Sequence, residues 1–341
     1  MANSIAKFKK YVPYLNEVYA ESSKTAILET NSALVKEGTN ANEILIPKMS
    51  MSGLGDYSRD NGYVDGSATL DYQTIKFDYD RGRSFNIDAM DDEETAGVAF
   101  GSLASEFIRS KVVPEIDAYR FATYAANANY KHWFKSAEKN GDKLIEGITA
   151  AATSLDELSA PYEGRYLFIT PTDLNTIMQL DSYKSKTILD TFEDVIRVPQ
   201  SRFYSAIDML DGASGGEEAG GYKPTPVTYK PLSTQPDDWN SNYGNYYVKD
   251  SSDESKFKAN TSSTFNANQV YERTGAYNLD FMIIPKSSVF QYTKHTVNKV
   301  ISPDDNQTSD AWKFFYRVYG VADKLDKKAI AMGYTLDNMQ V

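Results

Sequence analysis

Two stretches indicate how this chain folds: "DRGRSFNIDAMDDEET" at residues 80–95 and "IRSKVVPEIDAYRFATYA" at residues 108–125. The first continues an alternation of apolar and polar residues that starts at Ile75 and is typical of a β-strand. The second places apolar residues three or four positions apart, as an amphipathic helix does. The chain therefore changes from strand to helix close to Asp91.

On the N-terminal side of this change, residues 44–90 are predicted to form a long β-hairpin that projects from the protein. "DRG" at residues 80–82 supplies suitable residues for its turn. Leu70 and Tyr72 stand at even positions, whereas the apolar residues that follow them stand at odd positions. One extra residue in the strand would produce this change, so we expect a β-bulge at Gln73-Thr74. The segment has few apolar partners close in sequence, which favours a projecting loop that packs elsewhere.

On the C-terminal side, a long helix is predicted from Asp91 to about Ala126. Asp91 can cap it together with Glu94 in a capping box, and Pro114 predicts a kink or local break. About 35 helical residues at 1.5 Å each would give a rod about 50 Å long. Such a rod suggests a structural framework rather than a catalytic scaffold.

The middle of the chain predicts a compact α/β unit. An amphipathic helix is expected over 143–158, and an apolar strand at 166–169 is followed by Pro171, with Thr170 or Thr172 able to cap the next helix. Further strand and edge residues are expected between 195 and 210.

The later part of the chain is more irregular. Residues 213–278 are rich in Gly, Ser, Asn and Pro, which predicts a small β-rich insertion or a long loop. "YNLDFMIIPKSSVFQYTKH" at 277–295 predicts a strand, a proline and a helix. Alternating residues at 315–321 and a further strand at 329–334 predict a terminal hairpin.

Composition limits the possible functions. The 341 residues allow two or three subdomains, and the net charge of −11 disfavours tight DNA binding, which needs clustered Lys and Arg. An aromatic share of 13% suits large contact surfaces. The absence of cysteine removes disulfides and thiolate chemistry and suggests folding in a reducing cytoplasm. No apolar run reaches the length of a membrane span or of a signal peptide, so we expect a soluble protein that is not exported.

A calcium loop is one chemical alternative for the acidic stretch, because Asp78 and Asp80 match two early ligand positions. The pattern then fails, since Gly82 replaces the third ligand, Arg83 the turn glycine and Ala89 the bidentate Glu. We therefore expect no metal site.

The sequence also contains no motif that indicates a catalytic site. His132 and His295 are the only histidines and neither belongs to a motif, so each is expected to be a packed or surface residue. A glycoside hydrolase with two paired acids stays open, because such pairs are set in space rather than in sequence. We expect no enzyme, no catalytic residue and no cofactor.

A carbohydrate-binding or adhesive surface module is a further alternative. It rests on aromatic residues in an Asn-rich context, namely Tyr229, Trp239, Tyr243, Tyr246 and Tyr247.

The order of elements nevertheless resembles the major capsid protein of tailed bacteriophages, with the HK97-type fold. The resemblance rests on the two opening stretches, on "LFITPTDLNTIM" at 167–178, on "VPQSRFYSAIDMLDG" at 198–212 and on "FFYRVYGVADKLDKKAIAMGY" at 314–334. It covers the chain from about Ile44 to Tyr334, apart from much of 226–275.

The resemblance implies an α+β capsid fold with five parts. These are an N-terminal arm (1–43), an extended E-loop hairpin (44–90), a peripheral domain with a spine helix (91–142), an α/β axial domain (143–310) that carries the insertion at 213–278, and a C-terminal hairpin that returns to the core (311–341).

The resemblance also implies a function and partners. Copies of the chain would assemble into hexamers and pentamers of an icosahedral phage head that encloses double-stranded DNA without reading its sequence. A separate scaffolding protein, a portal and a possible decoration protein would be its other partners, with assembly in the host cytoplasm and a final location in the virion. The E-loop residues expected to contact a neighbouring subunit are Tyr72, Ile75, Phe77, Asp78, Asp80, Arg81, Arg83 and Phe85.

Overall fold

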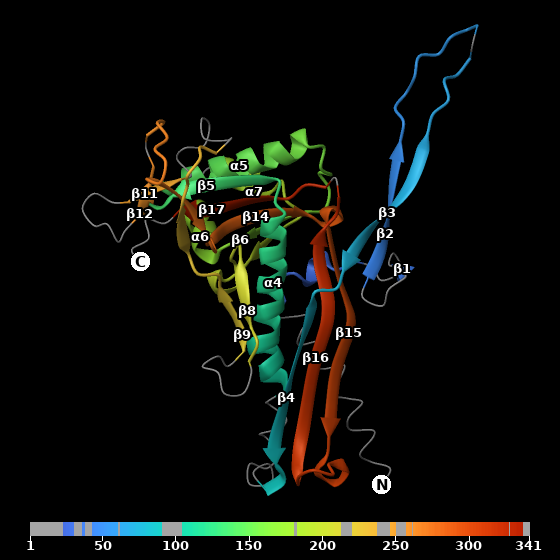
Figure 1. The fold of residues 1–341 in the computed structure, drawn as a ribbon, viewed down its shortest axis with the longest axis vertical. Helices are drawn as coiled ribbons and strands as arrows, with labels where there is room; N and C mark the ends of the chain where they lie inside the picture. The colour runs from blue at the N-terminus through green and yellow to red at the C-terminus, as the bar shows by residue number, and fades with distance from the viewer. Residues whose placement is uncertain are drawn as a thin grey trace. The chain divides into compact units, whose positions relative to one another are not determined.

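A computed structural model shows an α+β protein with few helices and many strands (Figure 1). The residues it describes are 23–30, 36–37, 43–60, 62–90, 104–180, 183–212, 220–236, 246–249, 257–260, 262–326 and 328–336. Their contacts divide them into two compact units. The first includes Ala26–Glu106 and Phe290–Lys327, and the second includes Glu21–Thr25, Phe107–Val289 and Lys328–Val341.

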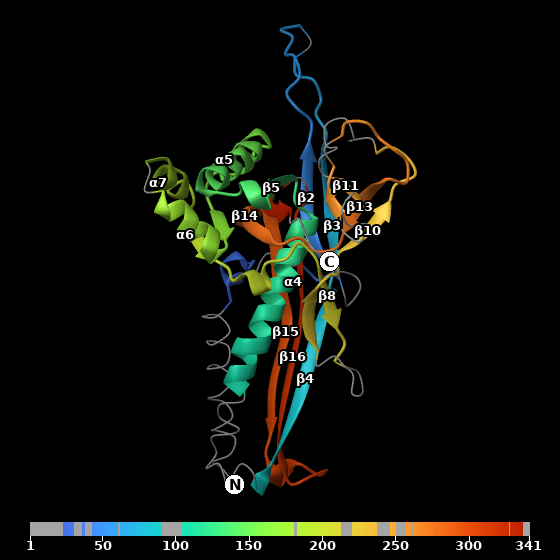
Figure 2. The ribbon, with the colours of Figure 1, turned by 90° about the vertical axis from the view of Figure 1, so that its left-hand side faces the viewer.

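The first unit contains two three-stranded sheets. The sheet of order β1-β2-β3 is formed by Lys36–Glu37, Glu43–Met51 and Ala68–Lys76. The sheet of order β15-β16-β4 is formed by Val289–Ile301, Ala311–Lys324 and Tyr79–Asp88 (Figure 2). A short 3-10 helix, η8 (Pro303–Asp305), lies between β15 and β16 in the chain.

The predicted turn at residues 80–82 is wrong, because these residues lie inside β4. Every residue from Tyr79 to Asp88 is paired with one of β16 in a single antiparallel register. Gly82 allows the two backbones to approach, since a Cβ atom there would lie 2.8 Å from the carbonyl oxygen of Tyr316. The partner strand is more than 220 residues away in sequence, so local turn chemistry could not reveal this pairing.

A projecting hairpin does exist, and it is formed by β2 and β3. The nine pairs run from Glu43↔Lys76 to Met51↔Ala68 without a shift, so the β-bulge predicted at Gln73-Thr74 is also wrong. The connection between the strands is formed by residues 52–67, of which Asn61 lies outside the described residues. The change of the apolar residues from even to odd positions therefore has a cause other than a bulge.

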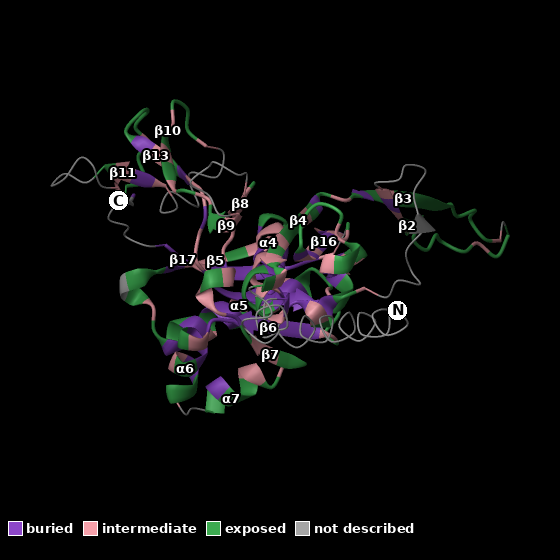
Figure 3. Cartoon of the chain, turned by 90° about the horizontal axis from the view of Figure 1, so that it is seen from below, coloured by how far each residue is buried: buried purple, intermediate pink, exposed green. Residues whose placement is uncertain are grey.

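The second unit is built on a five-stranded sheet of order β5-β17-β14-β6-β7. Its strands are Tyr130–Lys135, Ala331–Leu336, Leu279–Pro285, Arg165–Ile169 and Asp194–Arg197. All residues of β14 and β6 are buried, as expected for central strands covered on both faces. Figure 3 shows β6 within the buried part of the second unit. The strand predicted at 166–169 is therefore confirmed.

Three helices pack beside this sheet, namely α5 (Gly141–Glu157), α6 (Pro171–Gln179) and α7 (Tyr183–Leu189) (Figure 2). The buried residues of α5 include Leu144, Ile148 and Leu155, which confirms the amphipathic helix predicted there. Its Gly147 allows close approach to β5, since a Cβ atom would lie 2.6 Å from the Phe134 ring. The hydroxyl of Thr170 accepts the N–H of Asp173, so Thr170 is the helix cap.

The long helix is described only from Ala104, so the predicted capping box at Asp91 lies outside the described residues. The helix contains a π-helical segment, η3 (Ile108–Val112), followed by α4 (Val113–Ala126). The N–H of Val113 donates to the oxygen of Ile108, five residues earlier. This confirms the local break predicted at Pro114, because proline lacks an N–H and crowds the preceding turn.

The described part of the predicted insertion is rich in β-structure. A four-stranded sheet of order β10-β13-β11-β12 is formed by Thr228–Pro231, Val270–Thr274, Tyr247–Lys249 and Phe257–Ala259. The η5 helix (Gln200–Arg202) and the β8–β9 pair (Ile207–Leu210 and Gly221–Pro224) precede this sheet in the chain.

Two predictions for the C-terminal third are wrong. Residues after Pro285 form only a short 3-10 helix, η7 (Lys286–Ser288), and then β15, whose β-branched and aromatic residues favour a strand. The terminal hairpin is absent, because β16 pairs with β4 whereas β17 pairs with β14 and β5 in the second unit. Adjacent strands in sequence thus belong to different sheets.

Candidate subunit interface

The hairpin of β2 and β3 has two faces of different character. Residues directly opposite each other in an antiparallel pair project to the same face. Pro47 pairs with Tyr72 and Met49 pairs with Leu70, so these four side chains share one face. All four are exposed, with 64% of Met49, 55% of Leu70 and 47% of Tyr72 accessible to solvent.

The opposite face is apolar only at the base of the hairpin. Ile44 and Ile75 lie opposite each other there, are 2% exposed, and form a small core with Phe290 and Val321. Further along, the same face carries the pairs Lys48↔Asp71 and Ser50↔Thr69. The apolar residues therefore change face along the hairpin, which explains the parity change that suggested a bulge.

Polar contacts fix the base of the hairpin to the end of β16. The Lys48 Nζ atom lies 2.6 Å from an Asp326 carboxylate oxygen. Gln73 donates through Nε2 to the carbonyl of Lys324 and accepts the N–H of Asp326, at 3.3 and 3.0 Å. The base is thus fixed to the rest of the first unit, whereas most residues of β2 and β3 beyond it are exposed (Figure 3).

The connection at the end of the hairpin is also exposed and contains apolar side chains. Ser52 and Ser67 close it through a 2.9 Å contact between their hydroxyls, and the rings of Tyr57 and Tyr63 lie 4.9 Å apart. Exposed apolar residues in this connection are Leu54, Tyr57, Tyr63 and Val64.

We call the exposed set Pro47, Met49, Met51, Leu70 and Tyr72 the apolar hairpin face. Of its members, the sequence predictions included only Tyr72. The others could have been found from their shared face, since Leu70 and Tyr72 alternate in one strand as Pro47, Met49 and Met51 do in the other.

The other predicted contact residues lie in different surroundings. Ile75 is buried in the base core. Phe77 is half-buried and its ring stacks on Tyr319 at 4.8 Å, with the Lys294 ammonium 5.4 Å from the ring centre. Asp78 is exposed and lies just before β4.

The predicted residues within β4 lie on the β15-β16-β4 sheet. Asp80 accepts two hydrogen bonds from Arg317, at 2.8 and 2.6 Å, and these lower the pKa of Asp80. Phe85 is half-buried, with its ring 6.4 Å from that of Phe314. Arg81 is half-buried and Arg83 is exposed. The predicted contact set is therefore divided between two sheets.

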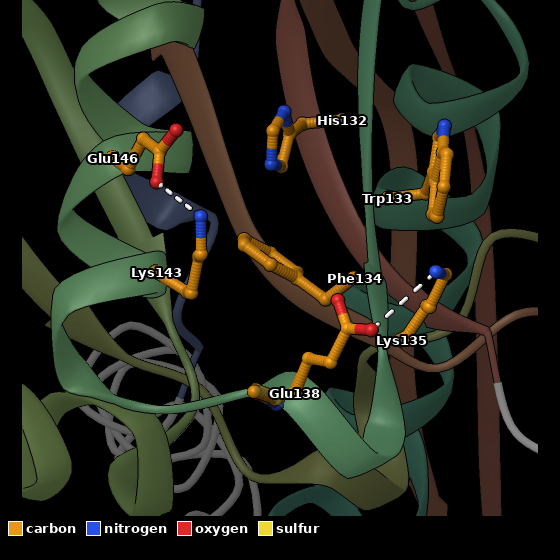
Figure 4. Close-up of a pocket in the computed structure, with 8 residues that line it drawn as sticks. His132, Trp133, Phe134, Lys135, Glu138, Lys143 and Glu146 are labelled. Carbon is orange, nitrogen blue, oxygen red and sulfur yellow. Dashed lines mark hydrogen bonds and ion pairs between the residues drawn. The ribbon is translucent and has the colours of Figure 1, made fainter.

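A hollow of about 340 Å³ in the second unit is lined by His132 and by several ionisable side chains (Figure 4). His132 lies in it next to Phe134, with ring centres 4.7 Å apart, and burial lowers the pKa of His132. Lys143 and Glu146 pair with each other, as do Lys135 and Glu138, at its exposed rim. His132 is thus a packed residue, as expected.

The aromatic residues proposed for carbohydrate binding do not form an exposed platform. The Tyr229 ring stacks on Phe257 at 4.0 Å, and Tyr247 is 2% exposed. Tyr246 is half-buried, whereas Trp239 and Tyr243 lie outside the described residues. This packing does not favour the carbohydrate-binding alternative.

Within the described residues, no group of three or more His, Asp or Glu side chains could hold a metal ion. The helices of this part of the chain include none that is both long and apolar enough to cross a membrane.

The solved structures that are similar to this chain include capsids. The chain of the capsid structure of cyanophage P-SCSP1u is similar with a TM-score of 0.50 and 11% identity, over 91% of this chain and 87% of that one. For the capsid structure of Staphylococcus phage Andhra the TM-score is 0.45 and the identity 10%, over 89% of this chain and 84% of that one. For a virus-like particle from Pyrococcus furiosus the TM-score is 0.45 and the identity 8%, over 94% of this chain and 98% of that one.

No protein-family model matches the sequence. No curated protein matches it either. At 11% identity the likeness to the cyanophage chain concerns the fold alone. The expected resemblance to phage capsid proteins is thus confirmed at the level of the fold: this chain has an α+β fold like that of the cyanophage capsid chain.

Proposed function

We propose that the chain is a major capsid protein that assembles into hexamers and pentamers of an icosahedral phage head. The observation that carries the proposal is the likeness to the cyanophage capsid chain, which spans about nine-tenths of both chains. The apolar hairpin face supports it, because a projecting strand pair with exposed Met and Leu gains stability when another subunit covers it.

The assignment of parts follows from this proposal. Residues 44–90 would contain the E-loop, with β2 and β3 as its hairpin, and 91–142 would hold the spine helix. The axial domain would take 143–310 with its insertion, while 1–43 and 311–341 would be the arm and the returning C-terminal segment. Seven of the expected residues stay proposed as contacts with a neighbour, namely Tyr72, Phe77, Asp78, Asp80, Arg81, Arg83 and Phe85. Ile75 is left out, because it is buried in the base core of the hairpin.

The energetics suit a closed shell. Covering one Met or Leu side chain contributes about 2 kcal/mol, so two or three such residues give a modest contact. Each subunit repeats the same contact around a closed symmetric assembly, and the sum over many contacts stabilises the particle while single contacts stay reversible.

The same proposal covers location and partners. The chain would act in the virion as a structural protein rather than as an enzyme, after assembly in the host cytoplasm with scaffolding, portal and decoration proteins. Its net charge of −11 is suited to a shell that encloses double-stranded DNA without adhering to it.

Expression of the full chain, alone and with the proteins encoded beside it, tests this function. Electron microscopy and analytical ultracentrifugation are expected to reveal shells, or rings of five and six subunits. A folded protein that stays monomeric at all concentrations, and also with a scaffolding protein, would contradict the proposal.

A further inference from the structure

A buried carboxylate on α4 holds a short segment from the beginning of the described chain. Asp117 is completely buried, and its Oδ1 atom accepts hydrogen bonds from the Ser23 hydroxyl at 2.8 Å and from the Thr25 hydroxyl at 2.7 Å. The backbone N–H groups of Lys24 and Thr25 donate to the same carboxylate, at 3.0 and 3.2 Å.

Two arginines complete this site. Arg202 from η5 lies 3.2 Å from the second carboxylate oxygen of Asp117 and supplies positive charge. Arg120, one turn after Asp117 on α4, donates through Nη1 to the Thr25 hydroxyl at 2.9 Å. The Thr25 hydroxyl therefore both donates to Asp117 and accepts from Arg120, and Thr25 is completely buried.

The hydrogen bonds of Asp117 mainly hold the Ser23–Thr25 segment and do little to stabilise α4 itself. Four hydrogen bonds to the Asp117 carboxylate come from three consecutive residues, Ser23 to Thr25. The helix has its own apolar contacts, since the ring of Phe121 lies 5.2 Å from that of Phe168 and 4.9 Å from that of Phe203. A buried carboxylate that mainly binds a separate segment acts as an anchor for that segment.

We propose that Asp117 is a positioning residue, which fixes Ser23–Thr25 on α4. The role in assembly rests on the function proposed above: when the anchor is lost, subunits stay folded but close into complete shells less often. The anchor itself is a property of the single chain and is testable without assembly.

Trypsin cleavage after Lys24 in the full chain reports on the anchor. In the wild type the bond between Lys24 and Thr25 is protected, because its N–H donates to Asp117 and Thr25 is buried. The double variant Ser23→Ala/Thr25→Val removes both hydroxyl donors and keeps the volume of Thr25. We expect cleavage after Lys24 to become about tenfold faster, because proteolysis follows local opening.

The control is Thr153→Val, which removes an exposed hydroxyl on α5 that donates to the Thr149 carbonyl. It is expected to leave cleavage after Lys24 unchanged. Asp117→Asn is the second test variant, since its amide has only one acceptor oxygen and cannot accept from both the Ser23 side and the Arg202 side. Hydrogen exchange of residues 23–30, read against that of α4, separates release of the segment from unfolding of the helix.

The outcomes distinguish the two proposals. Faster cleavage and exchange confined to the segment, with fewer closed particles by electron microscopy, supports the whole inference. Unchanged cleavage and exchange in both variants overturns the anchor. A released segment with an unchanged particle yield overturns its role in assembly, whereas a wild type that never assembles contradicts the proposed function and leaves the anchor to be decided by proteolysis.

Discussion

Met49 and Leu70 face each other across β2 and β3, and more than half of each side chain is exposed. Two large apolar residues in direct cross-strand contact are usually part of a covered face. Here the covered side of the hairpin lies at Ile44 and Ile75, on the other face. The exposed pair is therefore available to a second molecule.

The first prediction concerns this pair. Met49→Asp/Leu70→Asp is expected to reduce the yield of assembled particles about tenfold or more, because it removes about 2 kcal/mol of apolar burial per residue and adds two charges to be desolvated. The free energy of unfolding of the subunit is expected to change by about 0.5 kcal/mol or less, since both side chains are exposed. Electron microscopy and urea denaturation measure the two effects.

The control for this variant is Ser50→Asp/Thr69→Asp, an adjacent cross-strand pair on the opposite face. It adds the same two charges to the same strands at exposed positions. Equal particle yields from the two double variants would show that the apolar hairpin face is not the contact surface.

The second prediction concerns Gly82. Gly82→Ala is expected to destabilise the first unit by about 1–3 kcal/mol, because the new Cβ atom would lie 2.8 Å from the backbone oxygen of Tyr316 and the two strands would have to separate. Gly53→Ala is the control, since no atom lies within 4 Å of a Cβ atom there. Equal unfolding free energies of the two variants would exclude close strand approach as the reason for Gly82.

The sequence predicted those elements whose signals are local. The helix α5, the strand β6 and the Thr170 cap are recognisable from periodicity, β-branched and aromatic content, and a Thr-Pro pair. Strand partners were not predictable in this way, because β4 pairs with a strand more than 220 residues later. The same limitation produced the supposed turn at residues 80–82 and the terminal hairpin.

The candidate interface was predicted only in part for a related reason. The alternation around Tyr72 was recognised, but the face to which it belongs depends on the partner strand and on what covers that strand. Hydrophobic periodicity indicates that a face will be buried and does not indicate whether the same chain or another copy buries it.

The third prediction tests the proposed role of the arginines in β4. Arg81→Glu/Arg83→Glu is expected to lower particle yield several-fold while the subunit stays folded, because the backbone pairing of β4 with β16 does not depend on these side chains. The loss should grow at low salt, where charge repulsion is less screened. A particle yield equal to that of the wild type at low and at high salt would remove both residues from the contact set.

The fourth prediction concerns a buried triad in the second unit. The Lys139 ammonium lies 2.6 Å from Asp280 and 2.8 Å from Asp173, while the hydroxyls of Thr335 and Thr170 donate to these two carboxylates. Burial raises the pKa of Asp280 to about 6, although Lys139 opposes this shift. The folded state therefore holds a proton on Asp280 that the unfolded state has already released between about pH 4 and 6.

Stability consequently falls as the pH rises through that window, because the folded state binds more protons there than the unfolded state. A shift of about two pH units corresponds to about 3 kcal/mol. Asp280→Asn is expected to remove this slope while Lys139 keeps its pair with Asp173. Urea denaturation at pH 4.5, 5.5 and 7 measures it, with Asp142→Asn as a control that removes an exposed carboxylate of α5. If the wild type and Asp280→Asn lose stability equally between pH 4.5 and 7, the buried carboxylate is not the group that titrates.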